Sequence, residues 1–384
     1  MPLSSSKQDL KKICQQKSIG FGTYSISGAY SSKADNTVLK DILTTLMNKS
    51  IADFRIIDTA RLYGSQLGEN EQQLGKFLKE LVVQKQKFHI HTKCGIEIED
   101  NSFIITNDPQ KIKESCMKSL ENLTVEYIDV FYLHRLEADV THLSSQKLKD
   151  KFSPIVDILG ELIEEGKIRG IGLSEANENC IRAFYDLLKE KGKEDYFVAL
   201  QCEYSLVNQN TYKALRPLCN ELGLIFFAYS PINKGYLTDF ALENPDEIFT
   251  ASRATYSDQF SSENKDRNIV LLKKIKEIAE QVPCSIEEMA LAFLIREEPN
   301  IVIPLVSVST VEHLEKILDL SKIKLSDKVI QQINKLEPIS GNRLSKLLRD
   351  LTGNQMGAYD HPPLHDANEE EQVVIEYNIP KNSF

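Results

Sequence analysis

Eight short runs of β-branched and aromatic residues recur along the chain, and helical segments alternate with them. Several runs, such as 130–133 and 225–228, are apolar almost throughout, which is typical of parallel strands buried on both faces. We predict strands at 18–24, 54–59, 88–93, 127–134, 168–174, 197–203, 224–229 and 300–306. Eight βα units close most naturally into a (β/α)8 TIM barrel, and this α/β fold is our prediction.

The helical segments and the ends of the chain define the expected domain organisation. Asp108-Pro109 has the pattern of an N-cap followed by proline, which predicts a helix over 109–123, and Ser153-Pro154 predicts one that ends near Gly166. The polar stretch 245–266 is expected to be a long loop at the C-terminal face of the barrel. The spacing of apolar residues predicts further helices over 70–81, 178–191, 210–222, 268–281 and 285–297.

We expect a single barrel domain over residues 1–336. Residues 337–384 differ from the rest in their glycine, proline and acidic content, and we expect a C-terminal extension that packs on the barrel or is partly flexible.

The composition excludes several classes of function. Lys and Arg number 46 and Asp and Glu number 56, for a net charge of −10, so neither nucleic acid nor an anionic membrane surface is expected as a partner. There is no run of about 18 apolar residues, and the first residues lack the basic and apolar regions of a signal peptide. The seven cysteines are scattered without a Cys-x-x-Cys pair, which indicates reduced thiols in the cytoplasm.

Four polar residues lie at or just beyond the ends of three consecutive predicted strands. Asp58 is near the end of the second strand, with Tyr63 shortly after it, the third strand ends at Lys93 and the fourth at His134. Because the chemistry of a (β/α)8 barrel is located at the C-terminal ends of its strands, these side chains are expected to converge. Each residue alone is more often a cap, a turn residue or a solvated charge, but four at successive strand ends favour a functional site.

These residue types suit proton donation to an oxygen. A phenol has a pKa near 10, and a lysine ammonium close to Tyr63 is expected to lower it. Asp58 can supply the counter-ion that a buried Lys93 needs, and a neutral His134 can orient the substrate oxygen. Hydride transfer to a carbonyl fits this set. Metal-dependent hydrolysis fits less well with one His and one Asp, and no metal is expected.

The same segments carry a resemblance to a known family. Residues 58–64 (Asp-Thr-Ala-Arg-Leu-Tyr-Gly), with 68–71 and 74–75, resemble the aldo-keto reductase signature. Residues 91–93 and 132–134 look like the next two landmarks of that family, and the similarity extends from about residue 19 to 336. The resemblance implies a barrel that binds NADPH or NADH and either reduces aldehydes or ketones or oxidises the matching alcohols.

The resemblance also implies roles for individual residues. Tyr63 would be the general acid/base and Lys93 its tuning group, with Asp58 paired to Lys93 and His134 orienting the carbonyl. Cofactor contacts are implied, by position, at Gly22, Thr23, Asp58, Ser174, Glu175, Gln201, Tyr229, Ser230, Gly235, Ser307, Ser309, Thr310 and Glu315.

Within this set, Ser174 and Gln201 would hold the nicotinamide carboxamide, and the ring of Tyr229 would stack on the nicotinamide. Glu175 stands where asparagine is commoner in the family. The turn at 305–310 contains no Arg or Lys, so a preference for NADPH over NADH follows from the resemblance alone.

Alternatives stay open at this point. Some proteins with this resemblance bind a cofactor and partner proteins with little turnover, and the segment after Leu336 could serve such a partner. A phosphosugar enzyme without nicotinamide is less favoured, because 305–307 lacks the glycines of a phosphate-binding turn. The polar loops favour a sugar-like or other polar aldehyde as the small-molecule substrate. A monomer and a homo-oligomer are both compatible with the sequence.

Overall fold

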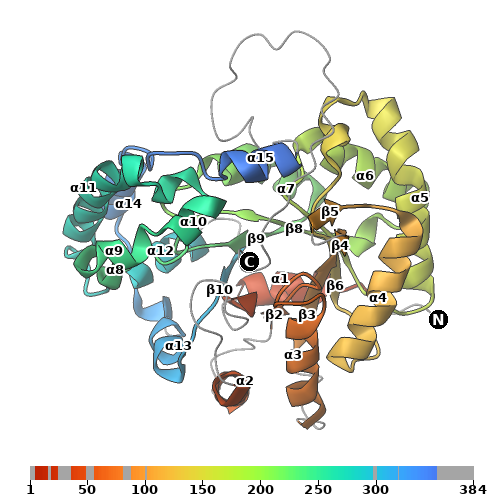
Figure 1. Cartoon of the computed structure of the whole chain (residues 1–384), viewed down its shortest axis with the longest axis horizontal. Helices are drawn as coiled ribbons and strands as arrows, with labels where there is room; N and C mark the ends of the chain where they lie inside the picture. The colour runs from red at the N-terminus through yellow and green to blue at the C-terminus, as the bar shows by residue number, and fades with distance from the viewer. Residues whose placement is uncertain are drawn as a thin grey trace.

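The computed structural model describes residues 5–15, 19–24, 36–48, 56–80, 88–99, 102–296, 301–318 and 320–352. Eight parallel strands in this part of the chain form a closed barrel in the order β1-β10-β9-β8-β7-β6-β3-β2 (Figure 1). All eight predicted strands and the predicted (β/α)8 fold are confirmed. The barrel strands are β1 (Gly20–Gly22), β2 (Ile56–Asp58), β3 (His89–Cys94), β6 (Val130–Leu133), β7 (Ile171–Ser174), β8 (Phe197–Glu203), β9 (Ile225–Tyr229) and β10 (Val302–Val306).

Helices surround the barrel and cover its outer face (Figure 1). The prediction for 109–123 is confirmed, and the carboxylate of Asp108 caps this helix by accepting from the backbone N–H of Lys111. The covering helices are α2 (Asn36–Asn48), α3 (Glu69–Glu80), α4 (Pro109–Leu123), α5 (Ser145–Glu164), α6 (Glu178–Glu190), α7 (Asn210–Leu222), α11 (Ser262–Ala279), α12 (Ile286–Ile295), α13 (Val311–Ile317) and α14 (Asp327–Asn334).

The start of α5 was predicted wrongly. The helix begins at Ser145, capped by the side chain of Ser144, and Pro154 lies inside it. A proline inside a helix removes one backbone hydrogen bond. Here Leu148 and Phe152 are buried in the core, so packing stabilises the turns that precede Pro154.

The polar stretch 245–266 was also predicted wrongly, because it is largely helical. It contains α9 (Pro245–Ile248), α10 (Ala251–Tyr256), the 3-10 helix η5 (Asp258–Phe260) and the start of α11. Ile248, Tyr256 and Phe260 are buried and hold these short helices on the barrel. Three buried apolar side chains among 22 mostly polar residues give too weak a periodicity to indicate helices.

Two further elements had no counterpart in the prediction. Helix α1 (Lys7–Gln15) packs Leu10 and Ile13 against side chains inside the barrel, and Asp9 pairs with Arg169, which precedes β7. Helix α1 therefore lies at the N-terminal end of the barrel. The antiparallel hairpin of β4 (Ile96–Glu99) and β5 (Ser102–Ile105) follows β3 at the opposite end.

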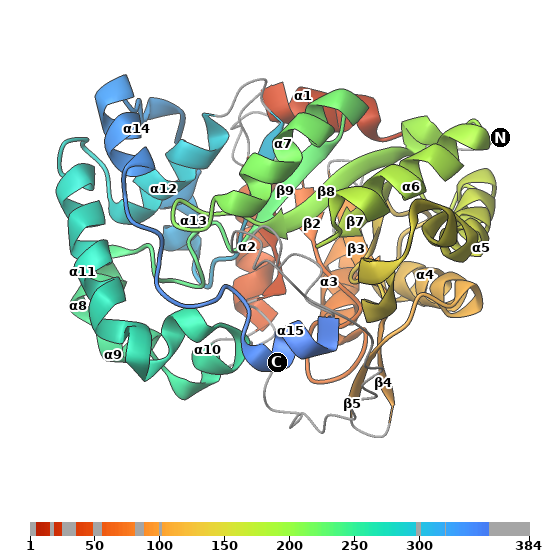
Figure 2. The same ribbon diagram turned by 90° about the horizontal axis from the view of Figure 1, so that it is seen from above.

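The described part of the predicted extension lies over the C-terminal end of the barrel. Helix α15 (Lys346–Thr352) contacts α10, and Figure 2 shows α1 and α15 on opposite sides of the barrel. The apolar run 373–375 and the rest of the chain after 352 lie outside the described residues. Within the described residues, no helix has both the length and the apolar composition needed to cross a membrane.

Candidate active site

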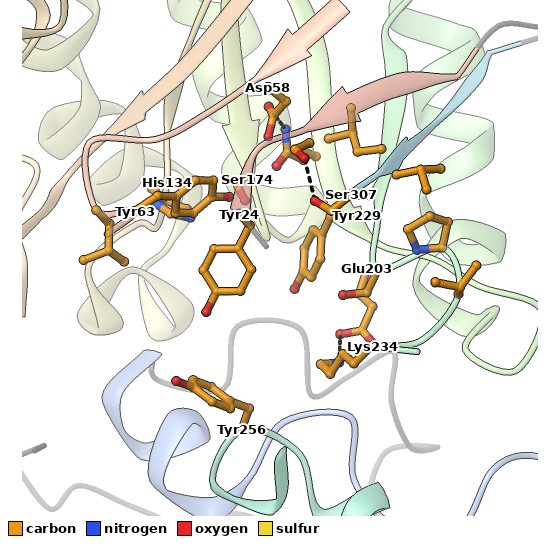
Figure 3. Close-up of a pocket in the computed structure, with 18 of the residues that line it drawn as sticks. Tyr24, Asp58, Tyr63, His134, Ser174, Glu203, Tyr229, Lys234, Tyr256 and Ser307 are labelled. Atoms are coloured by element: carbon orange, nitrogen blue, oxygen red, sulfur yellow. Dashed lines mark hydrogen bonds and ion pairs between the residues drawn. The ribbon is translucent and has the colours of Figure 1, made fainter. Parts of the chain in front are cut away.

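A cavity of about 450 Å³ opens where the barrel strands reach their C-terminal ends. Asp58, Tyr63 and His134 line it (Figure 3). The ammonium of Lys93 does not line the cavity but contacts both Asp58 and Tyr63. The structure thus brings together the four residues that the sequence placed at the ends of consecutive strands.

A buried ion pair forms the floor of this group. The Nζ atom of Lys93 lies 2.6 Å from Oδ2 of Asp58, 2.8 Å from the carbonyl oxygen of Thr59 and 3.2 Å from the hydroxyl oxygen of Tyr63. The other carboxylate oxygen of Asp58 accepts from the side-chain amide of Gln201 at 2.9 Å. The ammonium therefore has three oxygen partners in a place that water does not reach.

The pKa of Tyr63 corrects one expectation from the sequence. It is raised well above its ordinary value, first by burial and then by the carboxylate of Asp58, while Arg135 acts in the opposite direction. The expected net lowering is not found, because burial and the carboxylate of Asp58, which lies 2.6 Å from the ammonium of Lys93, outweigh the favourable effect of the nearby cations. The phenol is therefore protonated at neutral pH, which is the form a proton donor requires.

His134 is neutral at the same pH. Burial lowers its pKa well below the ordinary value, and the charges of Lys93 and Arg135 lower it further. The ring of His134 lies edge-on to that of Tyr63, with 5.9 Å between ring centroids and an interplanar angle of 76°. A neutral imidazole and a phenol therefore face the same part of the cavity, where both can donate to one oxygen atom.

Hydrogen bonds within the 58–75 segment, and from Thr23 and Thr92 to it, hold the Tyr63 loop. Asn70 accepts from the hydroxyls of Thr23 and Thr59, each at 2.6 Å, and the backbone N–H of Tyr63 donates to Ala60. The buried carboxylate of Glu71 accepts from the hydroxyl of Thr92 at 2.7 Å. These polar residues of the signature position the loop and do not themselves line the cavity.

Most of the residues implied as cofactor contacts line the cavity, and four do not. Thr23 donates to Asn70, Thr310 caps α13, Glu315 is exposed on α13, and Glu175 is turned away into a buried ion pair. The residues that line the cavity are Gly22, Asp58, Ser174, Gln201, Tyr229, Ser230, Gly235, Ser307 and Ser309.

The lining fits a nicotinamide nucleotide. The cavity extends from Tyr63 past Ser174 and Gln201 to Ser307, and it offers a hydroxyl and an amide for a carboxamide. The ring of Tyr229 points into it and offers a flat face (Figure 3). Gly22 keeps the cavity open beside Ser307, because a Cβ atom at position 22 would lie 3.0 Å from the hydroxyl oxygen of Ser307.

His313 also lines the cavity, and the sequence did not indicate it as a site residue. Its Nε2 atom lies 2.8 Å from both carboxylate oxygens of Glu287, and this hydrogen bond raises the pKa of His313. A histidine in a helix carries no signal of its own, and Glu287 belongs to a different helix.

The wall on the other side of Tyr63 is mainly apolar. Polar loops led us to expect a sugar-like or other polar substrate, but the loop side chains that face the cavity are mostly aliphatic or aromatic. Hairpin β4–β5, which was absent from the sequence prediction of the site, and the C-terminal segment supply most of them. The residues of this wall are Tyr24, Leu62, Ile96, Phe103, Ile105, Tyr256, Leu344 and Leu348.

Comparison with known proteins agrees with this geometry. A family model for the Aldo/keto reductase family matches residues 18–338. A probable aldo-keto reductase of Glycine max is 29% identical over 325 residues, which cover 84% of this chain and 85% of the relative. An aldo-keto reductase of Strobilurus tenacellus is 29% identical over 297 residues, which cover 76% and 80%.

Solved structures share the fold at lower identity. The glycerol dehydrogenase of Gluconobacter oxydans is 21% identical with a TM-score of 0.68, and the match covers 83% of this chain and 90% of that one. An aldo/keto reductase of Klebsiella pneumoniae, in complex with NADP and acetate, is 20% identical with a TM-score of 0.59, and the match covers 85% and 94%. From the family match across most of its length, this chain belongs to the aldo/keto reductase family.

Proposed function

We propose that this protein is an NADPH-dependent oxidoreductase that reduces an aldehyde or ketone to an alcohol. The observation that carries the proposal is the contact of Tyr63 with Lys93, at 3.2 Å, beside a cavity that also holds His134. The solved complex of the Klebsiella pneumoniae enzyme with NADP supports NADPH as the cofactor, with NADH as the alternative.

In this mechanism the substrate oxygen accepts hydrogen bonds from Tyr63 and His134. Bound NADPH would supply the hydride that forms the new C–H bond. Tyr63 gives its phenolic proton to the oxygen, which forms the O–H bond of the alcohol and leaves a phenolate. That phenolate is stabilised by the ammonium of Lys93 at 3.2 Å until it regains a proton from water.

The neutral state of His134 matters for the first of these steps. A neutral imidazole can donate one hydrogen bond to the carbonyl oxygen without competing with Tyr63 as an acid. Among the described residues that line the cavity, Tyr63 is then the group whose proton the substrate oxygen takes.

The apolar wall favours a substrate with an aromatic or aliphatic body. Phe103, Ile105 and Leu348 offer no hydrogen-bonding side chains to the hydroxyl groups of a sugar, and desolvating those groups without partners is unfavourable. We therefore propose aromatic and medium-chain aliphatic aldehydes ahead of sugar-like ones. A cytoplasmic location and a small-molecule carbonyl as the partner remain predictions from the sequence.

The test measures NADPH and NADH consumption with benzaldehyde, hexanal, a ketone and an aldose, for the wild-type and Tyr63→Phe proteins. We expect turnover that falls by at least about a thousandfold in Tyr63→Phe, with the Kd for NADPH unchanged. Wild-type activity in Tyr63→Phe would refute the mechanism. Tight cofactor binding without any turnover would favour a cofactor-binding regulatory protein.

A further inference from the structure

Arg343 is buried beside the cavity although it belongs to the segment after α14. It is 3% exposed and contacts residues at the C-terminal ends of strands β7, β8 and β9. Its guanidinium donates to both carboxylate oxygens of Glu175, at 2.7 and 3.1 Å, and to the hydroxyl of Tyr229 at 3.2 Å. One side chain from the C-terminal segment thus joins the ends of two barrel strands.

The carboxylate of Glu175 is fully occupied by these contacts. One oxygen also accepts from the backbone N–H of Glu203 at 2.9 Å, and the other lies 3.4 Å from Arg135. Burial alone would raise the pKa of Glu175, but Arg343 and then Arg135 lower it to about 2. Glu175 therefore stays charged and holds Arg343, which explains why it does not reach the cavity itself.

The backbone of Glu175 supports the same conclusion. Its φ angle is +53°, a left-handed conformation that is uncommon for residues with a Cβ atom. The residue holds this conformation while its N–H donates to the carbonyl oxygen of Gln201 and its carboxylate pairs with Arg343. Such a conformation persists where the surrounding contacts determine it.

Tyr229 links Arg343 to the cavity. The ring lines the cavity and points into it (Figure 3), while its hydroxyl accepts from Arg343. A hydrogen bond at the far end of the ring restricts how far the side chain can swing. Glu203 lies 3.6 Å from Arg343, but its closer contacts are with Lys234 at 3.0 Å and with Asn208, from which it accepts at 2.9 Å, so it keeps these partners without Arg343.

We propose that Arg343 is a positioning residue that fixes the ring of Tyr229 against the nicotinamide of the cofactor. The proposal rests on the proposed function, because it requires a nicotinamide in the cavity. Glu175 acts in it as the anchor of Arg343 and not as a direct cofactor contact.

The C-terminal segment has other attachments, which make the proposal testable. Asn342 donates to Asp258 at 2.8 Å, and Arg349 pairs with the same carboxylate at 2.9 Å. The backbone N–H of Ser345 donates to the carbonyl oxygen of Tyr256. Loss of Arg343 alone therefore leaves the segment in place, and Arg349→Met is a matched control that loosens the segment without touching Glu175 or Tyr229.

The experiment compares two nucleotides by calorimetry: NADPH, and 2′-phospho-ADP-ribose, which lacks the nicotinamide. Arg343→Met is expected to raise the Kd for NADPH about tenfold, the effect of losing one charge-assisted hydrogen bond, and to leave the Kd for 2′-phospho-ADP-ribose unchanged. Arg343→Lys keeps the charge but loses the planar fork, so we expect a smaller rise for NADPH alone. Arg349→Met should leave both Kd values unchanged.

Tyr229→Phe tests the same contact in case Arg343→Met does not fold. It keeps the ring and removes only the hydrogen bond to Arg343, and we expect the Kd for NADPH to rise about threefold with no change for 2′-phospho-ADP-ribose. An equal loss for both nucleotides, or no loss for either, would overturn the positioning role. If the wild-type protein bound NADPH no more tightly than 2′-phospho-ADP-ribose, the positioning role would be overturned as well. Wild-type binding of neither nucleotide would instead refute the proposed function and the positioning role together.

Discussion

The ammonium of Lys93 and the carboxylate of Asp58 form an ion pair at 2.6 Å, with side chains that are 0% and 4% exposed. Both charged groups are buried away from water, so the charge of each is stabilised by the other and by a few fixed polar partners. Burial raises the pKa of Asp58 and lowers that of Lys93, and the attraction between the two opposes both shifts. The pair therefore affects folding as well as the proton donor above it.

Replacing Lys93 with methionine should reduce both stability and activity. The change leaves the carboxylate of Asp58 buried without its counter-ion, which costs about 3–5 kcal/mol of unfolding free energy. We also expect kcat to fall by at least about a hundredfold, because the Tyr63 phenolate loses its stabilising charge. Urea unfolding and single-turnover kinetics measure the two effects.

The double variant Lys93→Met with Asp58→Asn separates these effects. It removes both charges, so most of the lost stability should return while kcat stays low. Recovery of activity together with stability would contradict a role for Lys93 beyond charge balance.

The pH dependence of reduction should be flat across the neutral range. His134 has a pKa well below its ordinary value and Tyr63 has one well above, so the donor pair keeps its neutral, protonated-phenol state. We expect kcat/KM in the free enzyme to vary little between about pH 7 and 9. A change in kcat/KM near pH 6.5 that is present in the wild type and absent in His134→Gln would show instead that the imidazole titrates normally.

Gly75 in α3 should resist replacement by alanine. Helix propensity alone predicts that Gly→Ala stabilises a helix by about 1 kcal/mol. At this position a Cβ atom would overlap the backbone carbonyl of Asn122 at the end of α4, so we expect a loss of at least about 3 kcal/mol. Thermal unfolding of Gly75→Ala gives the sign directly.

Gly160→Ala in α5 is the matched comparison. A Cβ atom there meets only the flexible end of Lys193, at 3.3 Å, so we expect unchanged or higher stability. Similar losses in both variants would mean that backbone contact between α3 and α4 is not the cause.

The pair of His313 and Glu287 should make stability depend on pH. The folded pKa of His313 is raised by its hydrogen bond to Glu287. A raised folded pKa stabilises the protein below the unfolded pKa near 6.5, and the contribution disappears as pH rises through the folded value.

Glu287→Gln should therefore lower the unfolding free energy at pH 6 and have little effect at pH 9. The loss should stay below about 1 kcal/mol, because the His313 side chain is 31% exposed. Urea unfolding at the two pH values measures it, and an equal loss at both would show that the pair is not ionised as described.

The sequence by itself determined the barrel and the positions of its main chemical groups. Several of the buried parallel strands are apolar almost throughout, which identifies them in the sequence. Asp58, Lys93 and His134 lie at or next to the ends of successive strands, so residue order alone places them on one face of the barrel. The Tyr63 loop could be recognised in the same way, because the hydrogen bonds that hold it lie largely within one segment.

Only the tertiary structure decided which contacts form between distant segments. Glu175 and Arg343 are separated by 168 residues, and nothing near either one indicates the pairing. The apolar wall likewise depends on how hairpin β4–β5 and the C-terminal segment with α15 pack at the C-terminal end of the barrel. The pKa of Tyr63 rises because burial and the nearby carboxylate of Asp58 act together, and both are properties of the folded chain that residue types alone do not carry.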